Sequence, residues 1–78
     1  MTKGEYRVGI NFNPSNDDMV GRIKRAAADL IDLIDVIKFS TDGRDTIVEV
    51  LRLKAQAQTA VEEAAMWAVK AATKPAAQ

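Results

Sequence analysis

Arg22, Lys24 and Arg25 place three cations within four residues of one predicted helix. Cations near a helix N-terminus bind phosphate well, because the terminal N–H groups and the helix dipole favour an anion. On a helix Arg22 and Arg25 share a face, and Lys24 points elsewhere. The alternative interpretation is an ordinary solvated face, on which Arg25 pairs with Asp29 four residues further on.

Tyr6 and Phe12 are two of the four aromatic residues in the chain, and both precede the three cations. A ring that stacks on a nucleobase contributes about 1–3 kcal/mol in single-strand binders. Cations for phosphates and flat rings for bases are the combination that nucleotide recognition needs. The alternative is that both rings fill gaps in the core of an oligomer.

Lys70 and Lys74 form a second basic feature, since no acidic residue follows Glu63. One interpretation is that the two lysines complement the negative end of a helix dipole. The other applies to an oligomer whose helix ends meet at a rotation axis. There, Lys74 from several subunits would form a ring able to hold a polyanion.

Composition argues against catalysis. The chain has no Cys and no His, so it lacks a thiolate nucleophile, the commonest general base and the usual metal ligands. Glu62 and Glu63 could do acid–base work, but no nucleophile or partner base is visible beside them. They share helix faces with Met66 and Trp67, and we interpret all four as structural, with Trp67 in the core. We expect no enzymatic activity, no cofactor and no metal site.

Charge and hydropathy narrow the partners. Eleven basic residues balance eleven acidic ones, whereas a binder of polymeric nucleic acid usually carries a basic excess. No apolar run reaches the roughly 18 residues that a membrane span needs, and no signal-peptide pattern is present. We therefore expect no polymeric nucleic acid and no membrane as partners, and a cytoplasmic location.

Residues 1–14 are predicted to be an extended N-terminal segment. Alternate positions are apolar from Tyr6 to Phe12, and this period of two is typical of extended chain. A lone strand leaves its backbone groups unpaired. The segment should therefore lie against the helices or against a neighbouring subunit.

Residues 15–39 are predicted to form the first helix, with Ser15 or Asn16 as the N-cap and Asp17 and Asp18 in the first turn. Its apolar positions recur every three or four residues and form one stripe. Three aspartates hold the opposite side in water. The stripe comprises Val20, Ile23, Ala27, Leu30, Ile34 and Ile37, and the aspartates are Asp29, Asp32 and Asp35.

Residues 44–73 are predicted to form a second, longer helix after a break at residues 40–43. Thr41 or Asp42 could cap this helix, with Asp45 in its first turn. Pro75 marks the stop. A short connection makes the two helices antiparallel neighbours, so the fold class is all-α, a single helical-hairpin domain over residues 1–78.

A two-helix hairpin is too thin to cover these apolar faces. Chains of this length without disulfide or metal usually need another source of stability. Large apolar patches mark interfaces, and the alanine-rich second half of residues 44–73 lets neighbours approach closely. We expect an obligate, compact homo-oligomer.

The run EEAAMWAVKA at residues 62–71 resembles the end of the second helix in the phage anti-CBASS protein 2 family, where an E-E-A-x-M-W-A stretch stands. The Phe12-Asn13-Pro14 turn, the following helix with Ile23 and Lys24, and the chain length are similar as well. The resemblance extends over nearly the whole chain.

This resemblance implies a helical hairpin that assembles as a hexamer and acts as a sponge in the infected bacterial host. Such a sponge binds the cyclic oligonucleotide messengers of CBASS immunity and denies them to the effector without cleaving them. Cyclic dinucleotides such as 3′,3′-cyclic GMP-AMP are bound between subunits, and cyclic trinucleotides in separate pockets where three subunits meet.

The site residues follow from the same resemblance. Phe12, or else Tyr6, corresponds to the aromatic that stacks on the base, and Lys24 to the lysine that meets phosphate. Lys74 stands where the family has an arginine and lacks its bidentate fork; Phe12 stands where the family has a tyrosine. The expected dinucleotide site comprises Tyr6, Arg7, Phe12, Asn13, Pro14, Arg22 and Lys24, and the trinucleotide site Lys70, Lys74 and Arg25.

Two other functions stay open at this point. A helical-hairpin oligomer could instead grip RNA or a host protein, although zero net charge tells against RNA. A phosphodiesterase has little support, because the chain lacks the usual catalytic side chains.

Overall fold

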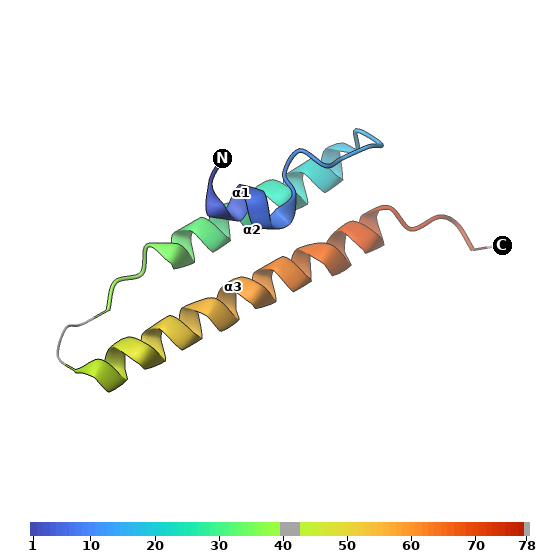
Figure 1. Ribbon diagram of the computed structural model, residues 1–78. Coiled ribbons are helices and arrows are strands. Elements are labelled where there is room, and N and C mark those ends of the chain that lie inside the picture. The colour runs from blue at the N-terminus through green and yellow to red at the C-terminus, as the bar shows by residue number, and fades with distance from the viewer. Residues whose placement is uncertain (40–42, 78) are drawn as a thin grey trace.

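The computed structural model describes residues 1–39 and 43–77. Within them the chain forms three helices and no strand: α1 (Lys3–Val8), α2 (Asp18–Asp35) and α3 (Arg44–Ala72). Figure 1 shows α2 and α3 running side by side in opposite directions, with α1 against α2. The prediction of an all-α helical hairpin is confirmed.

The prediction of an extended segment over residues 1–14 is wrong for Lys3–Val8, which are helical. The helix begins with a capping box, in which Thr2 accepts a hydrogen bond from the Glu5 N–H and Glu5 accepts one from the Thr2 N–H. It ends at Gly9, whose φ of 64° lies in the left-handed region that favours glycine. The capping residues therefore decide the local structure, although the apolar residues alternate in the sequence. The burial of residues 6–12 does not alternate.

Helix α2 is shorter than the predicted range 15–39. Its N-cap is Asp17 and not Ser15 or Asn16, because the Asp17 carboxylate accepts from the backbone N–H groups of Met19 and Val20. Asp18 lies in the first turn, as expected. The helix ends at Asp35, so residues 36–39 belong to the connection to α3.

Helix α3 nearly fills the predicted range 44–73. Gly43 is its N-cap and provides no side-chain hydrogen bond, and Asp45 lies in the first turn. The predicted caps Thr41 and Asp42, and residues 40–42 of the predicted break at 40–43, lie outside the described residues. None of the helices in the part of the chain that the structure describes is long and apolar enough to cross a membrane.

The buried core is small and centred on α2. Its apolar members in the described chain are Val20, Ala27, Ala28, Ile31 and Ala65. The predicted stripe of α2 is therefore partly wrong. Leu30 and Ile37 of that stripe are exposed, whereas Ala28 and Ile31, which the stripe does not include, are buried.

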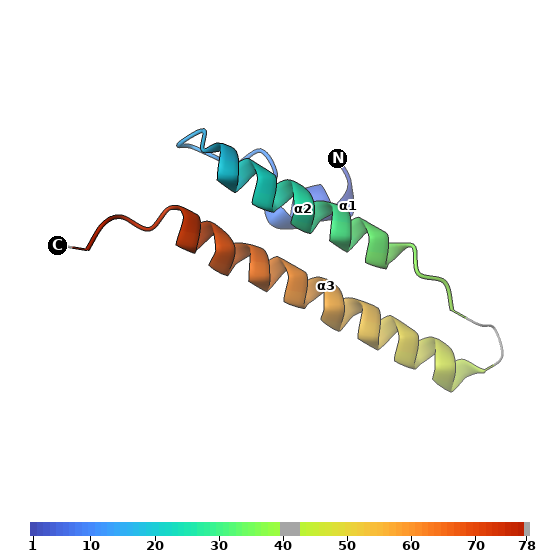
Figure 2. The ribbon, with the colours of Figure 1, turned by 180° about the vertical axis from the view of Figure 1, so that it is seen from behind.

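Helix α1 packs on one side of α2, as the two opposite views in Figures 1 and 2 show. A Cβ on Gly4 would come 2.9 Å from the Cα of Ala28 and closer still to its carbonyl, so only glycine permits this approach. The Gly4 N–H donates to the Asp32 carboxylate at 2.7 Å. Asp32 is therefore half-buried against α1 and does not simply point into water, contrary to the prediction.

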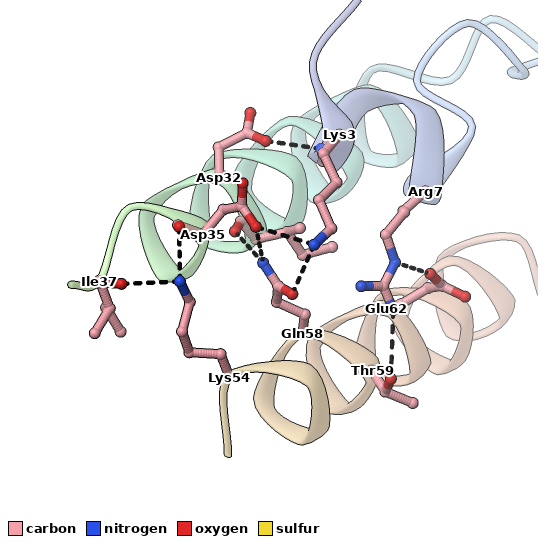
Figure 3. A network of polar contacts seen from close by, with 11 residues as sticks. Lys3, Arg7, Asp32, Asp35, Ile37, Lys54, Gln58, Thr59 and Glu62 are labelled. Carbon is pink, nitrogen blue, oxygen red and sulfur yellow. Dashed lines mark hydrogen bonds and ion pairs between the residues drawn. The ribbon is translucent and has the colours of Figure 1, made fainter. Parts of the chain in front are cut away.

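A polar network joins the three helices (Figure 3). Gln58 of α3, only 2% exposed, donates to the Ile31 carbonyl at 3.0 Å and to Asp35 at 3.2 Å. Lys3 of α1 bonds the same Asp35 at 2.9 Å and Gln58 at 3.1 Å. Lys54 donates to the carbonyls of Asp35 and Ile37. These bonds fix where α1 crosses the hairpin.

Candidate functional site

The loop between α1 and α2 is a chain of local hydrogen bonds. The Phe12 N–H donates to the Gly9 carbonyl at 2.9 Å. The Asn13 side chain donates to the Asp17 carbonyl at 2.8 Å and accepts from the Asp17 N–H at 3.1 Å. These two hydrogen bonds between Asn13 and the Asp17 backbone stabilise the turn that leads into α2.

Lys24 lies beneath this loop and is only 8% exposed. Its ammonium donates to the Gly9 carbonyl at 3.0 Å and also to the Phe12 carbonyl. The Nζ atom lies 5.4 Å from the centroid of the Phe12 ring. An ammonium has three donors, so two of them are used within the protein.

The predicted aromatics are on the surface. Phe12 is 72% exposed and Tyr6 is 77% exposed. Neither ring fills a core of the single chain, so both are available to a ligand or to another subunit. Pro14 is also exposed and lies with Asn13 at the tip of the same loop.

Two adjoining hollows separate this region from α3. One, of about 260 Å³, is lined by Arg7, Lys24, Glu62 and Met66 among others. The second, of about 320 Å³, lies beside Phe12 and Asn13 and shares Lys24 with the first. Ligand pockets generally measure about 300–1,000 Å³. Each hollow is therefore large enough for part of a nucleotide and too small to enclose a cyclic dinucleotide.

The structure brings five of the seven predicted dinucleotide-site residues around these two hollows. Arg7 is among them, but its guanidinium pairs with Glu62 at 2.8 Å and lies 3.4 Å from Thr59 (Figure 3). The other two, Tyr6 and Arg22, line neither hollow. The five are Arg7, Phe12, Asn13, Pro14 and Lys24.

Arg22 is exposed and makes no hydrogen bond or ion pair with the described residues. It lines a wide, open depression on the outer side of α2, together with Asp17 and Asp18. Those carboxylates reduce the positive potential there. Arg22 therefore lies near the loop without completing an anion site by itself.

Arg25 is committed to two carboxylates. It contacts Glu5 of α1 at 2.8 Å and Asp29 at 2.8 Å, so the pair predicted between Arg25 and Asp29 is confirmed. A hydrogen bond from the Thr2 backbone and the Arg25 contact lower the pKa of Glu5 from 4.5 to about 2. The hydrogen bonds with Glu5 and Asp29 raise the pKa of Arg25.

The residues predicted for a trinucleotide site do not meet in one chain. Lys70 lies in the last turn of α3, with its Nζ 5.6 Å from the Trp67 ring centroid. Lys74 follows the helix end. Within the described residues, no hydrogen bond, ion pair or hollow joins Arg25 to either lysine. A shared site would require other subunits.

Trp67 is 60% exposed, and Met66 is exposed as well. The interpretation of Trp67 as a core residue is therefore wrong for the single chain. Its Nε1 lies 3.5 Å from the Glu63 carboxylate, which confirms the shared face.

Two residues around the hollows could have been predicted. Glu62 lies one turn before the buried Ala65, on the α3 face that turns toward α2, and the exposed Met66 adjoins that face. The helical period alone indicates that face. The spacing Val20–Lys24–Ala28–Ile31 likewise indicates that Lys24 lies on the buried side of α2.

Comparison with known families matches the chain to the Acb2/Tad1 hairpin domain over residues 4–73. The chain belongs to this family. Comparison with curated proteins and with solved structures finds no match to either. The Acb2/Tad1 match spans α1, the Phe12 loop, α2 and α3, so every element around the two hollows belongs to the family's hairpin domain. It also confirms the resemblance read from the EEAAMWAVKA run.

Proposed function

We propose that this protein binds and sequesters cyclic oligonucleotide second messengers as a homo-oligomer, without cleaving them. The observation that carries the proposal is membership of the Acb2/Tad1 hairpin family over residues 4–73. In the cytoplasm of a phage-infected bacterium, such binding would keep the messenger from the CBASS effector.

Incomplete burial supports the assembly. The chain exposes 5863 Å², whereas a compact monomer of its 8.5 kDa mass exposes about 4,700 Å². Many of the exposed side chains are large and apolar, among them Leu33, Val48 and Leu53. The excess of roughly 1,200 Å² exceeds the 800 Å² or so that one partner buries in a standard interface. We propose a hexamer, following the resemblance.

The dinucleotide site would be completed by a second subunit. One chain offers an exposed Phe12 ring and the two small hollows around Lys24, with Arg22 nearby. A cyclic dinucleotide has two bases and two phosphates with near two-fold symmetry. An interface with two-fold symmetry presents each ring and each cation twice, which matches such a ligand.

Cyclic trinucleotides would bind elsewhere, where three subunits meet near the helix ends. Lys70 and Lys74 leave the C-terminal end of α3 basic, and no carboxylate follows Glu63 in the sequence. Three copies around one axis would supply three sets of these cations to three phosphates.

Calorimetric titration with 3′,3′-cyclic GMP-AMP tests the proposal. We expect saturable heat at micromolar protein, and chromatography of the heat-released ligand should recover it intact. A linear dinucleotide of the same bases and a single-stranded RNA are the comparison ligands. Binding of RNA without binding of the cyclic dinucleotide, or recovery of cleaved ligand, would contradict it.

A further inference from the structure

Lys24 occupies a position where a lysine is unusual. It lies on the α2 face that also carries Val20, Ala28 and Ile31, and it is nearly as buried as they are. A buried ammonium is unfavourable unless its donors are satisfied. Among the described residues no carboxylate pairs with it. Its partners are two backbone carbonyls, so Lys24 stabilises the backbone that carries them.

Those two carbonyls mark the ends of one turn. The turn runs from Gly9 to Phe12 and is closed by the bond from the Phe12 N–H to the Gly9 carbonyl. Lys24 donates to the carbonyl at each end, at Gly9 and at Phe12. Because Gly9 is also the C-cap of α1, one ammonium fixes both the end of α1 and the residue that carries the exposed ring.

Lys24 also contacts the Phe12 ring itself. Phe12 is mostly exposed, yet the Lys24 Nζ lies near its centroid, at the distance of a cation–π contact. The next residue along the chain, Asn13, is hydrogen-bonded to the Asp17 backbone. An exposed aromatic on a backbone that is tied at both ends loses little freedom when it stacks on a ligand.

We infer that Lys24 is a positioning residue, which clamps the Gly9–Phe12 turn and so presents the Phe12 ring in its stacking position before any ligand arrives. The inference rests on the proposed function for its ligand, a cyclic dinucleotide. It differs from a direct phosphate contact because the clamp exists in the ligand-free protein. Lys24 therefore contributes to affinity through Phe12, in addition to the phosphate contact that the resemblance implies.

Lys54 provides a matched control. Its ammonium also donates to two backbone carbonyls, at Asp35 and Ile37, at the opposite end of α2 (Figure 3). Lys24→Met and Lys54→Met therefore remove the same charge and the same kind of clamp from two different segments. A lysine that is merely structural lowers stability and leaves both the Phe12 turn and the affinity unchanged.

The experiment measures amide hydrogen exchange in the ligand-free protein and then affinity for 3′,3′-cyclic GMP-AMP. In Lys24→Met we expect the Ile10 and Phe12 amides to exchange at least about tenfold faster and affinity to fall by a similar factor, as loss of a hydrogen bond to a charged group implies. In Lys54→Met we expect neither change. Trp67 and the other α3 amides report whether the variant is folded.

The two proposals fail in different ways. Unchanged exchange at Ile10 and Phe12 in Lys24→Met overturns the clamp, whatever the affinity. Faster exchange with wild-type affinity overturns the role of the clamp in binding. If the wild-type protein itself binds no cyclic dinucleotide, the proposed function fails, while the exchange comparison still supports or overturns the clamp.

Discussion

Gly4 of α1 lies against the backbone of Ala28 in α2, so closely that a Cβ at Gly4 would overlap the Ala28 carbonyl. This contact joins a short helix, which could not persist alone, to the hairpin. The loop that carries Phe12 begins at the end of α1. The position of the proposed binding loop therefore depends on a glycine that lines neither hollow.

Gly4→Ala should destabilise the fold by about 1–3 kcal/mol, as overpacking does, even though alanine is the better helix former. Gly21→Ala is the control, because a Cβ there would meet the Asn13 side chain at 3.8 Å, an ordinary contact. That variant should be as stable as the wild type or more so, by up to about 1 kcal/mol. Urea denaturation at one protein concentration measures both. Equal stability of Gly4→Ala and wild type would show that α1 is not packed on Ala28.

Gln58→Met should cost about 1–3 kcal/mol. The side chain keeps its length, but Lys3 and Asp35 lose a buried partner. Gln56→Met is the matched control, since Gln56 is exposed and accepts a bond from Arg52 alone among the described residues. Its effect should stay within about 0.5 kcal/mol. Thermal unfolding of both variants measures the difference, and similar losses would argue against the polar network.

Acid should loosen the attachment of α1. The pKa of Glu5 is lowered from 4.5 to about 2, chiefly by the Thr2 backbone and Arg25. The pKa of Asp35 is lowered by Lys3 and Gln58. A carboxyl whose pKa is lower in the folded state than in the unfolded chain stabilises the fold at a pH above its unfolded pKa. That stabilisation is lost as the pH falls through the folded pKa.

Urea denaturation across the range from neutral pH to about 2 measures this loss. Glu5→Gln should be less stable than the wild type at neutral pH and should lose less stability on acidification. Parallel pH profiles for the two proteins would mean that Glu5 is not held by these contacts.

Phe12→Leu should weaken binding of the cyclic dinucleotide by a factor of about 5 to 150, the equivalent of 1–3 kcal/mol for a stacked base. Leucine keeps an apolar side chain, so the mass of the assembly should not change. Calorimetry gives the affinity and light scattering the mass. Wild-type affinity in Phe12→Leu would show that Phe12 does not stack on the base, and would leave Tyr6 as the candidate.

The two long helices could be predicted because their signals are local. Apolar positions recur with the helical period, Asp18 and Asp45 lie in first turns, and Pro75 ends the second helix. Helix α1 was missed although its T-x-x-E capping box, Thr2 to Glu5, stands in the sequence. The apolar alternation from Tyr6 to Phe12 outweighed it, and the packing of Gly4 on Ala28 is a long-range contact that no local pattern contains.

The candidate site was predicted less completely than the fold. Phe12 and Lys24 do lie together, as the cluster of rings and cations suggested. The burial of Lys24 was not predicted, although Lys24 has helical spacing with the buried residues Val20, Ala28 and Ile31. The pairing of Arg7 with Glu62 depends on a contact between segments 55 residues apart, which sequence spacing cannot reveal.

Sedimentation equilibrium of the ligand-free protein at dilute concentration shows whether the binding cavities form only when copies of the hairpin assemble. We expect one folded species with several times the 8.5 kDa mass of the chain. A well-folded species of 8.5 kDa under the same conditions would contradict it.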